Sequence, residues 1–295
     1  IAQCLVGSEM CIRDRKGSDL VKRIFRFPLK QNIGAKAAPK VVEGDKIVRG
    51  QLIASVGEGE LGANLFSSVS GSVTGIDENE IRVQADEVQP SEFVKLSGSN
   101  PLELIREAGI VGLGGAGFPT YFKTDGIVIV NAAECEPILG HNIAAIEKNP
   151  QKLIRGLQIV MDIVHSSKGV VAIKEVHTQA VEKLRETLED DRIRIALLPD
   201  MYPMGEERAV IREVTGTLLG VDTLPLDADA IVVNAETACR IEEAVDLKKP
   251  LIDKDMTVAG KLRGNTDLIR IFENVPIGMS VRDVFDMAGG LADEY

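Results

Sequence analysis

A glycine-rich segment at residues 112–119, GLGGAGFP, has the composition of a phosphate-binding loop. Glycines allow backbone N–H groups to approach a ligand closely, and the N-terminus of a following helix adds a partial positive charge. Lys123 can add a full positive charge nearby. We therefore expect a phosphate-bearing ligand to bind where this segment leads into a helix.

The spacing of Gly112, Gly114 and Gly117 also satisfies the dinucleotide fingerprint G-x-G-x-x-G. That fingerprint must follow directly on a β-strand, and an acidic residue completes it about 20 positions later. Glu134 and Glu136 lie near that offset, but the residues before Gly112 predict a helix. Three interpretations stay open on the pattern alone: another type of phosphate loop, a nicotinamide-binding fingerprint, and a structural turn.

A second polar segment, NAAECEP at 131–137, follows a predicted buried strand. Asn131 offers both a donor and an acceptor. Glu134 and Glu136 form a pair of carboxylates, which suits the hydroxyl groups of a ribityl chain or a ribose better than a phosphate. The simpler interpretation is a solvated exit from the strand.

A third constellation consists of YPMGEERAVIREVTG at 202–216 and VVNAET at 232–237. Glu206 and Glu207 begin a predicted helix, where the helix dipole favours negative charge. This capping role explains them without a ligand. The functional alternative is hydrogen bonding to the ribose and carboxamide of a nucleotide.

The elements that must position these segments alternate between strand and helix. The strands are predicted in GIVIVNAAE, GVVAIKE, IRIALLPD and DAIVVNAET. Helices are predicted in LELIREAG, closed by Gly109, in the run after Asn149 and Pro150, in HTQAVEKLRETLED, and in GEERAVIREVTG, ended by Gly216. This βαβ order predicts a mostly parallel sheet, and such sheets bind ligands at the carboxyl ends of their strands.

The flanking regions differ from this centre. Residues 27–98 contain short alternating runs with Gly-containing turns, which predicts a small β domain. EGDKIVRGQLI and SSVSGSVTGI resemble the two halves of the barrel-sandwich hybrid of lipoyl and biotinyl carriers. The stretch between them, EGELGANLFSS, lacks the lysine of those carriers, so we expect a structural or docking module. After Lys248, the sequence predicts a β-rich stretch and then a strand, a turn and a short helix.

Composition limits the function. The chain has 295 residues and a net charge of −11, which argues against nucleic-acid binding, and no apolar run approaches the roughly 20 residues of a membrane span. Residues 1–15 resemble a translated sequencing-adapter scar and are set aside. The remaining cysteines, Cys135 and Cys239, form no disulfide framework, and no C-x-x-C is present for zinc or iron–sulfur ligation. We therefore expect no metal site in this chain.

Together GLGGAGFPT, NAAECEP, YPMGEERAVIREVTG and VVNAET resemble the flavoprotein fold of the NADH-binding subunit of respiratory complex I, and more closely the RnfC family of Rnf electron-transport complexes. ECEPILGHN and YPMGEERA are most similar to the proline reductase-associated branch, PrdC. The resemblance implies a multi-domain α/β protein. Its expected parts are a barrel-sandwich hybrid at 20–98, an FMN/NADH-binding domain at 102–247 and a truncated ubiquitin-like (SLBB) segment at 248–295.

The resemblance also implies roles for particular residues. FMN is expected to be wrapped by Gly112, Gly114, Gly115 and Gly117, with Lys123 near its phosphate or ribityl oxygens. Phe118 matches a ring that stacks on the nicotinamide nucleotide, and Asn131 and Glu134 match flavin contacts. The pocket for flavin and NADH is expected to be lined by Tyr202, Gly205, Glu206 and Glu207, with Asn234 and Thr237 near the FMN phosphate.

The implied function is electron transfer. NADH would reduce FMN by hydride transfer, without an acid–base side chain, and 4Fe–4S clusters outside this chain would carry electrons to a proline reductase or to Rnf membrane subunits. A cytoplasmic location follows, peripheral on the inner face of the cell membrane if the partner is of the Rnf type. Leu113 stands where the complex I loop has arginine, a second aromatic clamp for NADH is missing, and the chain stops before any cluster cysteines, as a fragment would. The alternatives are a cofactor-free docking scaffold and an NAD-only oxidoreductase.

Replacing Gly115 or Gly117 by a bulky residue should abolish flavin binding, because a side chain there would keep the backbone away from the ligand. The measurement is the flavin affinity of each variant beside that of the original chain. Unchanged affinity would refute the role proposed for these glycines.

Overall fold

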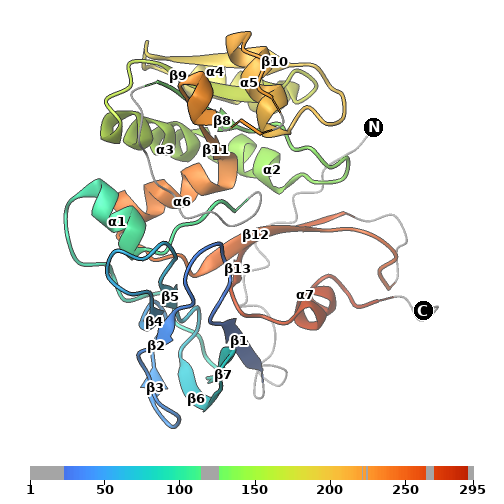
Figure 1. The fold of residues 1–295 in the computed structure, drawn as a ribbon. Helices are drawn as coiled ribbons and strands as arrows, with labels where there is room; N and C mark the ends of the chain where they lie inside the picture. The colour runs from blue at the N-terminus through green and yellow to red at the C-terminus, as the bar shows by residue number, and fades with distance from the viewer. Residues whose placement is uncertain (1–22, 114–125, 221, 224, 264–268, 292–295) are drawn as a thin grey trace.

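The computed structural model describes residues 23–113, 126–220, 222–223, 225–263 and 269–291. An α/β half, a β module and a smaller third segment make up the molecule (Figure 1). A four-stranded parallel sheet forms the centre of the α/β half, in the order β10-β9-β8-β11. Its strands are β8 (Ile127–Asn131), β9 (Gly169–Lys174), β10 (Ile193–Leu198) and β11 (Ala230–Asn234). The α/β class with a mostly parallel sheet is thus confirmed.

The strand order contains one reversal of direction. From β8 the chain adds β9 and then β10 on one side, and it returns to place β11 on the other side of β8. The carboxyl ends of β8 and β11 therefore border a topological switch point, the place where open α/β sheets bind ligands. The register of the pair sets Asn131 opposite Asn234 at this point.

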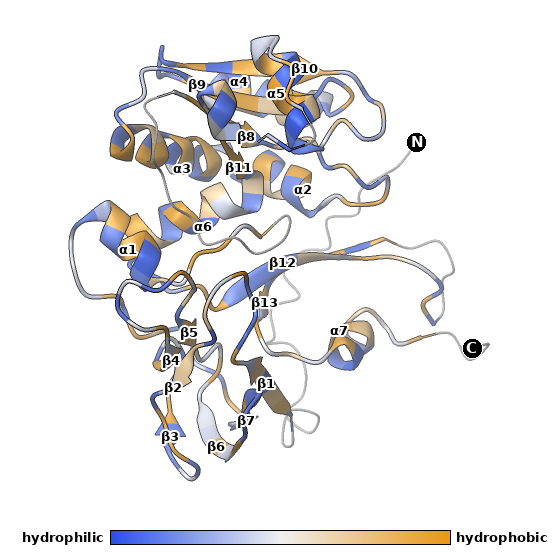
Figure 2. Ribbon diagram, viewed as in Figure 1, coloured by the Kyte–Doolittle hydropathy of each residue, from blue (hydrophilic) through white to orange (hydrophobic). Residues whose placement is uncertain are grey.

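Helices cover both faces of the sheet. Alternate residues of β8 divide between the two layers: Val128 and Val130 pack on one face and Ile129 on the other. The first face carries α1 (Pro101–Glu107), α2 (His141–Lys148), α3 (Pro150–Ile163), α4 (Thr178–Thr187) and α6 (Ala235–Asp246), and the second carries α5 (Glu207–Thr215). Figure 2 shows α3 with both apolar and polar residues, as expected for a helix with one face on a sheet.

Several predicted boundaries are confirmed. Gly109 and Gly216 follow α1 and α5 in the left-handed conformation, and Asn149 caps α3 by accepting a hydrogen bond from the Lys152 N–H. The sequence analysis does not predict α2 or α6. Helix α6 begins at the residue after β11, so no polar loop separates the two patterns, and its buried stripe consists largely of small residues.

The β module is built from short antiparallel strands in two sheets, β1-β7-β6-β3 and β2-β4-β5. Their bounds are β1 (Ile24–Pro28), β2 (Ala38–Pro39), β3 (Lys46–Ile47), β4 (Leu52–Ser55), β5 (Leu65–Phe66), β6 (Gly71–Ile76) and β7 (Glu80–Ala85). Both sheets contribute to one core that includes Phe27, Ile53 and Ile81. A small β domain before the α/β half is what the sequence predicts.

The third segment lies between the other two parts. An antiparallel pair, β12 (Asp253–Val258) and β13 (Arg270–Pro276), is followed by α7 (Val281–Met287), with the short 3-10 helix η2 (Pro225–Ala228) earlier in the chain. In Figure 1, β12 runs between α6 and the β module. Backbone hydrogen bonds fasten the segment to both neighbours: Leu251 N–H donates to the Ala108 carbonyl, and Arg26 N–H donates to the Gly278 carbonyl. Within the described ranges, no helix combines the length and apolar character of a membrane span.

A close approach of two helices places α6. A Cβ added to Gly156 of α3 would overlap the backbone carbonyl of Ala238 in α6. We expect Gly156→Val to lower the free energy of unfolding by about 3 kcal/mol, because overpacking a helix contact forces the backbone to shift. Chemical denaturation followed by far-UV circular dichroism measures this loss.

The matched control is Gln151→Val, which places the same side chain at an exposed position of α3. It should change stability by less than about 1 kcal/mol. Equal losses in the two variants would show that helix propensity, and not the contact with α6, explains the effect.

Candidate functional site

The switch point is lined by two asparagines with defined structural roles. Asn234 is the N-cap of α6, and its Oδ1 accepts hydrogen bonds from Glu236 N–H (2.9 Å) and Thr237 N–H (3.3 Å). Asn131 uses its Oδ1 to accept from Ala133 N–H (3.1 Å) and its Nδ2 to donate to the Gly205 carbonyl (2.9 Å). The two side chains therefore organise the turns that leave β8 and β11.

Gly205 joins a third segment to this place. A Cβ at residue 205 would overlap the Ala133 carbonyl oxygen and lie 2.8 Å from the Cβ of Cys135. Only glycine allows this approach, so the segment before α5 rests directly on the exit from β8. The structure thus brings together Asn131, Gly205 and Asn234 as the sequence analysis expects of one site.

Glu134 is the buried carboxylate of the site, with 8% of its surface exposed. Its Oε1 accepts a hydrogen bond from Asn142 N–H (2.9 Å), while its buried Oε2 has no hydrogen-bond partner. Burial raises the pKa of Glu134 to about 7, although the bond from Asn142 and the charge of Lys174 act in the opposite direction. A group that stays protonated near neutral pH can donate a hydrogen bond from Oε2.

The expected pairing of Glu134 with Glu136 is wrong in one respect. Glu136 is exposed while Glu134 is buried, so the two acids have different environments and do not present equivalent carboxylates. The chain leaves β8 through a buried backbone run and reaches solvent only after Glu134. Only Glu134 belongs to the interior of the site.

Lys174 is a site residue that the sequence analysis misses. It ends β9, is buried, and places Nζ 3.3 Å from Oδ1 of the exposed Asp200. Its charge also acts on Glu134. The available signal was a lysine at the end of an otherwise apolar strand, which is costly to bury without a purpose or a partner.

The glycine-rich segment begins beside the first turn of α6. Leu113 N–H donates to Thr237 Oγ1 (3.0 Å), and the Leu113 carbonyl accepts from Lys254 Nζ (3.1 Å). Gly112 thus enters the switch point next to Asn234. Gly114, Gly115, Gly117, Phe118 and Lys123 lie outside the described residues, so their roles stay predictions.

The described residues before Gly112 do not fit a dinucleotide fingerprint. Helix α1 ends at Glu107 and Gly109 turns the chain, so no β-strand of the described chain leads into Gly112. The NAD-only interpretation requires such a strand. It is therefore contradicted.

The start of α5 is stabilised by its own side chains. Glu206 is the N-cap, accepting from Ala209 N–H (3.1 Å) and from Arg208 Nε (2.9 Å). Burial would raise the pKa of Glu206, but these hydrogen bonds lower it below its ordinary value. Glu207 is exposed at the first helical position, and Tyr202 is 71% exposed. The capping interpretation of Glu206 is confirmed, while a ligand role for Tyr202 and Glu207 stays a prediction.

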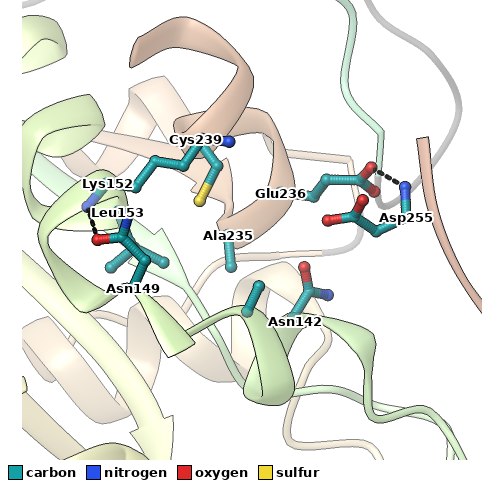
Figure 3. A pocket seen from close by; sticks show the side chains of 9 residues that line it. Asn142, Asn149, Lys152, Leu153, Ala235, Glu236, Cys239 and Asp255 are labelled. Atoms are coloured by element: carbon teal, nitrogen blue, oxygen red, sulfur yellow. Dashed lines mark hydrogen bonds between the residues drawn. The ribbon is translucent and has the colours of Figure 1, made fainter. Parts of the chain in front are cut away.

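A small cavity lies behind the N-terminus of α6, between α6, α2 and α3 (Figure 3). Its volume of about 30 Å³ suits a single water molecule and excludes a cofactor. Its lining includes Asn142, Lys152, Glu236 and Cys239. Burial raises the pKa of the Cys239 thiol to about 12, so this cysteine is not a nucleophile.

Comparison with known proteins assigns the parts of the chain. Residues 105–243 match the model of the Nuo51 FMN-binding domain, and residues 18–93 match the RnfC barrel sandwich hybrid domain. The chain belongs to the RnfC family. Its α/β half is thus an FMN-binding domain of the Nuo51 type, and the β module is the RnfC barrel-sandwich hybrid.

Curated relatives of this RnfC-family chain are longer than it is. The RnfC-type component of a proton-translocating ferredoxin:NAD+ oxidoreductase complex from Clostridium ljungdahlii is 32% identical, over 91% of this chain and 63% of its own length. The corresponding component of a Na+-translocating complex from Acetobacterium woodii is 30% identical over 91% and 65%. Cobalamin reductase PduS from Salmonella typhimurium is 36% identical over 74% and 45%.

Solved structures support the fold. A crystal structure of an NAD+-reducing NiFe-hydrogenase in the air-oxidised state superposes with a TM-score of 0.54 at 21% identity, over 66% of this RnfC-family chain and 39% of that chain. The resemblance to the RnfC family is confirmed, whereas the proline reductase-associated branch stays a prediction.

The raised pKa of Glu134 predicts a pH-dependent stability. Its folded-state pKa of about 7 lies above its ordinary value of 4.5, so stability present at low pH is lost as the pH rises from about 4.5 to 7. The loss amounts to about 3 kcal/mol. Glu134→Gln should remove it, since the amide oxygen can still accept from Asn142.

Chemical denaturation of both proteins at pH 5 and pH 8 measures this effect. The variant should gain stability relative to the original chain as the pH rises. A difference that does not change with pH would mean that Glu134 is ionised throughout the folded protein.

Proposed function

We propose that this chain is the flavin-carrying part of an electron-transfer subunit, which accepts a hydride from NADH on FMN. The observation that carries the proposal is the convergence of Leu113, Asn131, Glu134 and Gly205 on the switch point of a domain that matches the Nuo51 FMN-binding model. Open α/β sheets bind nucleotides at such points.

The residues at this point fit the cofactor. The buried Oε2 of Glu134 lacks a partner, and the buried Lys174 has a single exposed one, so both can meet polar groups of a ligand. A flavin offers such groups in its ring and ribityl chain. FMN, when bound, supplies the hydride acceptance and the one-electron release that amino acids lack.

Each residue of the chain then has a task. Asn234 and Thr237 hold the first turn of α6 and the start of the glycine segment, which is proposed to bind the phosphate through Gly112, Gly114, Gly115 and Gly117 with Lys123. Asn131 fixes the Gly205 segment against β8. Glu134 holds a proton at Oε2 near neutral pH and donates it to a ligand acceptor without transferring it.

NADH is proposed to bind on the open side of this site. Phe118, Tyr202 and Glu207 would contact the nucleotide, and Glu206 would act indirectly by starting α5 at the right place. Relatives named as components of ferredoxin:NAD+ oxidoreductase complexes support a nicotinamide substrate.

The onward path of the electrons is proposed to lie outside this sequence. Among the described residues, no group of three His, Cys, Asp or Glu side chains could hold a metal ion. The relatives extend well beyond the matched part, and 4Fe–4S clusters are proposed for that region. The acceptor would be a redox partner, either Rnf membrane subunits or a proline reductase, at the cytoplasmic face of the membrane.

The test is a visible spectrum of residues 16–295 after incubation with FMN and desalting, recorded before and after anaerobic NADH. We expect a retained flavin band that bleaches with NADH. A retained band that NADH does not bleach would contradict the nicotinamide part of the proposal and indicate another electron donor. Loss of the band on desalting would contradict the flavin part and favour a docking scaffold.

A further inference from the structure

A buried cluster of charges connects the three parts of the molecule. We call it the α6 ion cluster, and its members are Arg49, Lys152, Glu236, Arg240, Glu243, Lys249, Asp253, Lys254 and Asp255. It extends from Arg49 in the β module, through Asp253 of β12, to Glu236 in the first turn of α6. At its far end lies Lys254, beside the candidate cofactor site.

Lys254 holds the start of the glycine-rich segment. Its Nζ lies 2.8 Å from Glu236 Oε2 and 3.1 Å from the Leu113 carbonyl oxygen. Glu236 is itself fixed, because the Asp255 N–H donates to its Oε1 at 2.7 Å. Leu113 is thus held on one side by Thr237 and on the other by Lys254, and its own side chain brings no charge.

Charge balance makes Lys254 the cation that can serve a ligand. The α6 ion cluster contains five cationic side chains and four carboxylates. Glu236 keeps Arg240 as a second partner, so its charge does not depend on Lys254 alone. Lys254 is also the most exposed of the five cations, at 37% of its side chain, whereas Glu236 is 2% exposed.

The neighbouring histidine does not compete for this role. His141 Nδ1 lies 3.0 Å from Thr257 Oγ1, and burial lowers the pKa of His141, with Lys254 adding to that effect against Glu236 and Asp255. At neutral pH the imidazole is therefore uncharged, and Lys254 is the positive group at this point.

We infer that Lys254 is a cofactor-binding residue, which supplies positive charge to the phosphate of FMN while it fixes the Leu113 carbonyl. The inference rests on the proposed function. Lys254 lies outside residues 105–243, so the segment after the FMN-binding domain completes the cofactor site. A cation in this place favours a phosphate-bearing flavin over one that lacks the phosphate.

The test compares FMN with riboflavin, which differs only by the phosphate. Quenching of flavin fluorescence gives the dissociation constant of each for the original chain and for Lys254→Gln. We expect the variant to lose FMN affinity about 10- to 100-fold, the range for one charge-assisted hydrogen bond, and to keep its riboflavin affinity. Lys254→Arg should retain the preference for FMN.

The matched control is Lys152→Gln. Lys152 belongs to the same cluster, pairing with Glu243 at 2.6 Å, and its removal changes the net charge equally without touching Leu113. Its FMN-to-riboflavin preference should equal that of the original chain. Far-UV circular dichroism confirms that each variant is folded.

Three results would overturn the inference. Equal loss of both flavins in Lys254→Gln would show a purely structural role, and equal loss of FMN preference in both variants would show a long-range charge effect. Unchanged FMN affinity would show no role at all. In each case the original chain still binds FMN, and the proposed function stands. If the original chain binds neither flavin, the proposed function fails as well.

Discussion

The parallel pairing of β8 with β11 is the constraint on which the site depends. Parallel strands send the chain out of the sheet at the same edge, so the segments that follow them meet although they are far apart in sequence. The register sets Asn131 opposite Asn234, and both side chains hold the turns beyond the strands. A shift of one residue would turn these asparagines to the opposite face and separate the segments.

Close backbone approaches complete this arrangement. Gly205 lies against the exit from β8, and Gly156 allows α3 to meet α6, whose N-terminus borders the site. Neither position tolerates a side chain, because in each case the neighbour is a backbone carbonyl that cannot move aside. The sheet thus provides the direction of the segments, and the glycines determine how near they come.

The buried charges add position more than stability. Removing ions from water costs as much as their attraction returns, so the α6 ion cluster is not a source of net stability. Its partners come from α3, α6, β12 and the β module, and each bond restricts one element relative to another. The same reasoning applies to Glu134 and Lys174, whose incomplete pairing inside the protein is the feature that a bound cofactor would use.

The sequence by itself determined the local structure and the family. Apolar runs such as GVVAIK predicted buried parallel strands, Asn149 and Gly216 predicted helix ends, and the polar segments at strand ends predicted the place of the site. These features depend on residues near one another in the chain, so their pattern can be read directly.

The tertiary structure alone decided which polar residues share an environment. The difference between Glu134 and Glu136, the burial of Lys174, and the contact of Lys254 with Leu113 all depend on distant segments that meet only after folding. Helix α6 was missed for a related reason, since its small buried residues become a recognisable face only against α3. The charge and pKa of a side chain are set by its burial and its partners, and neither is a property of the local sequence.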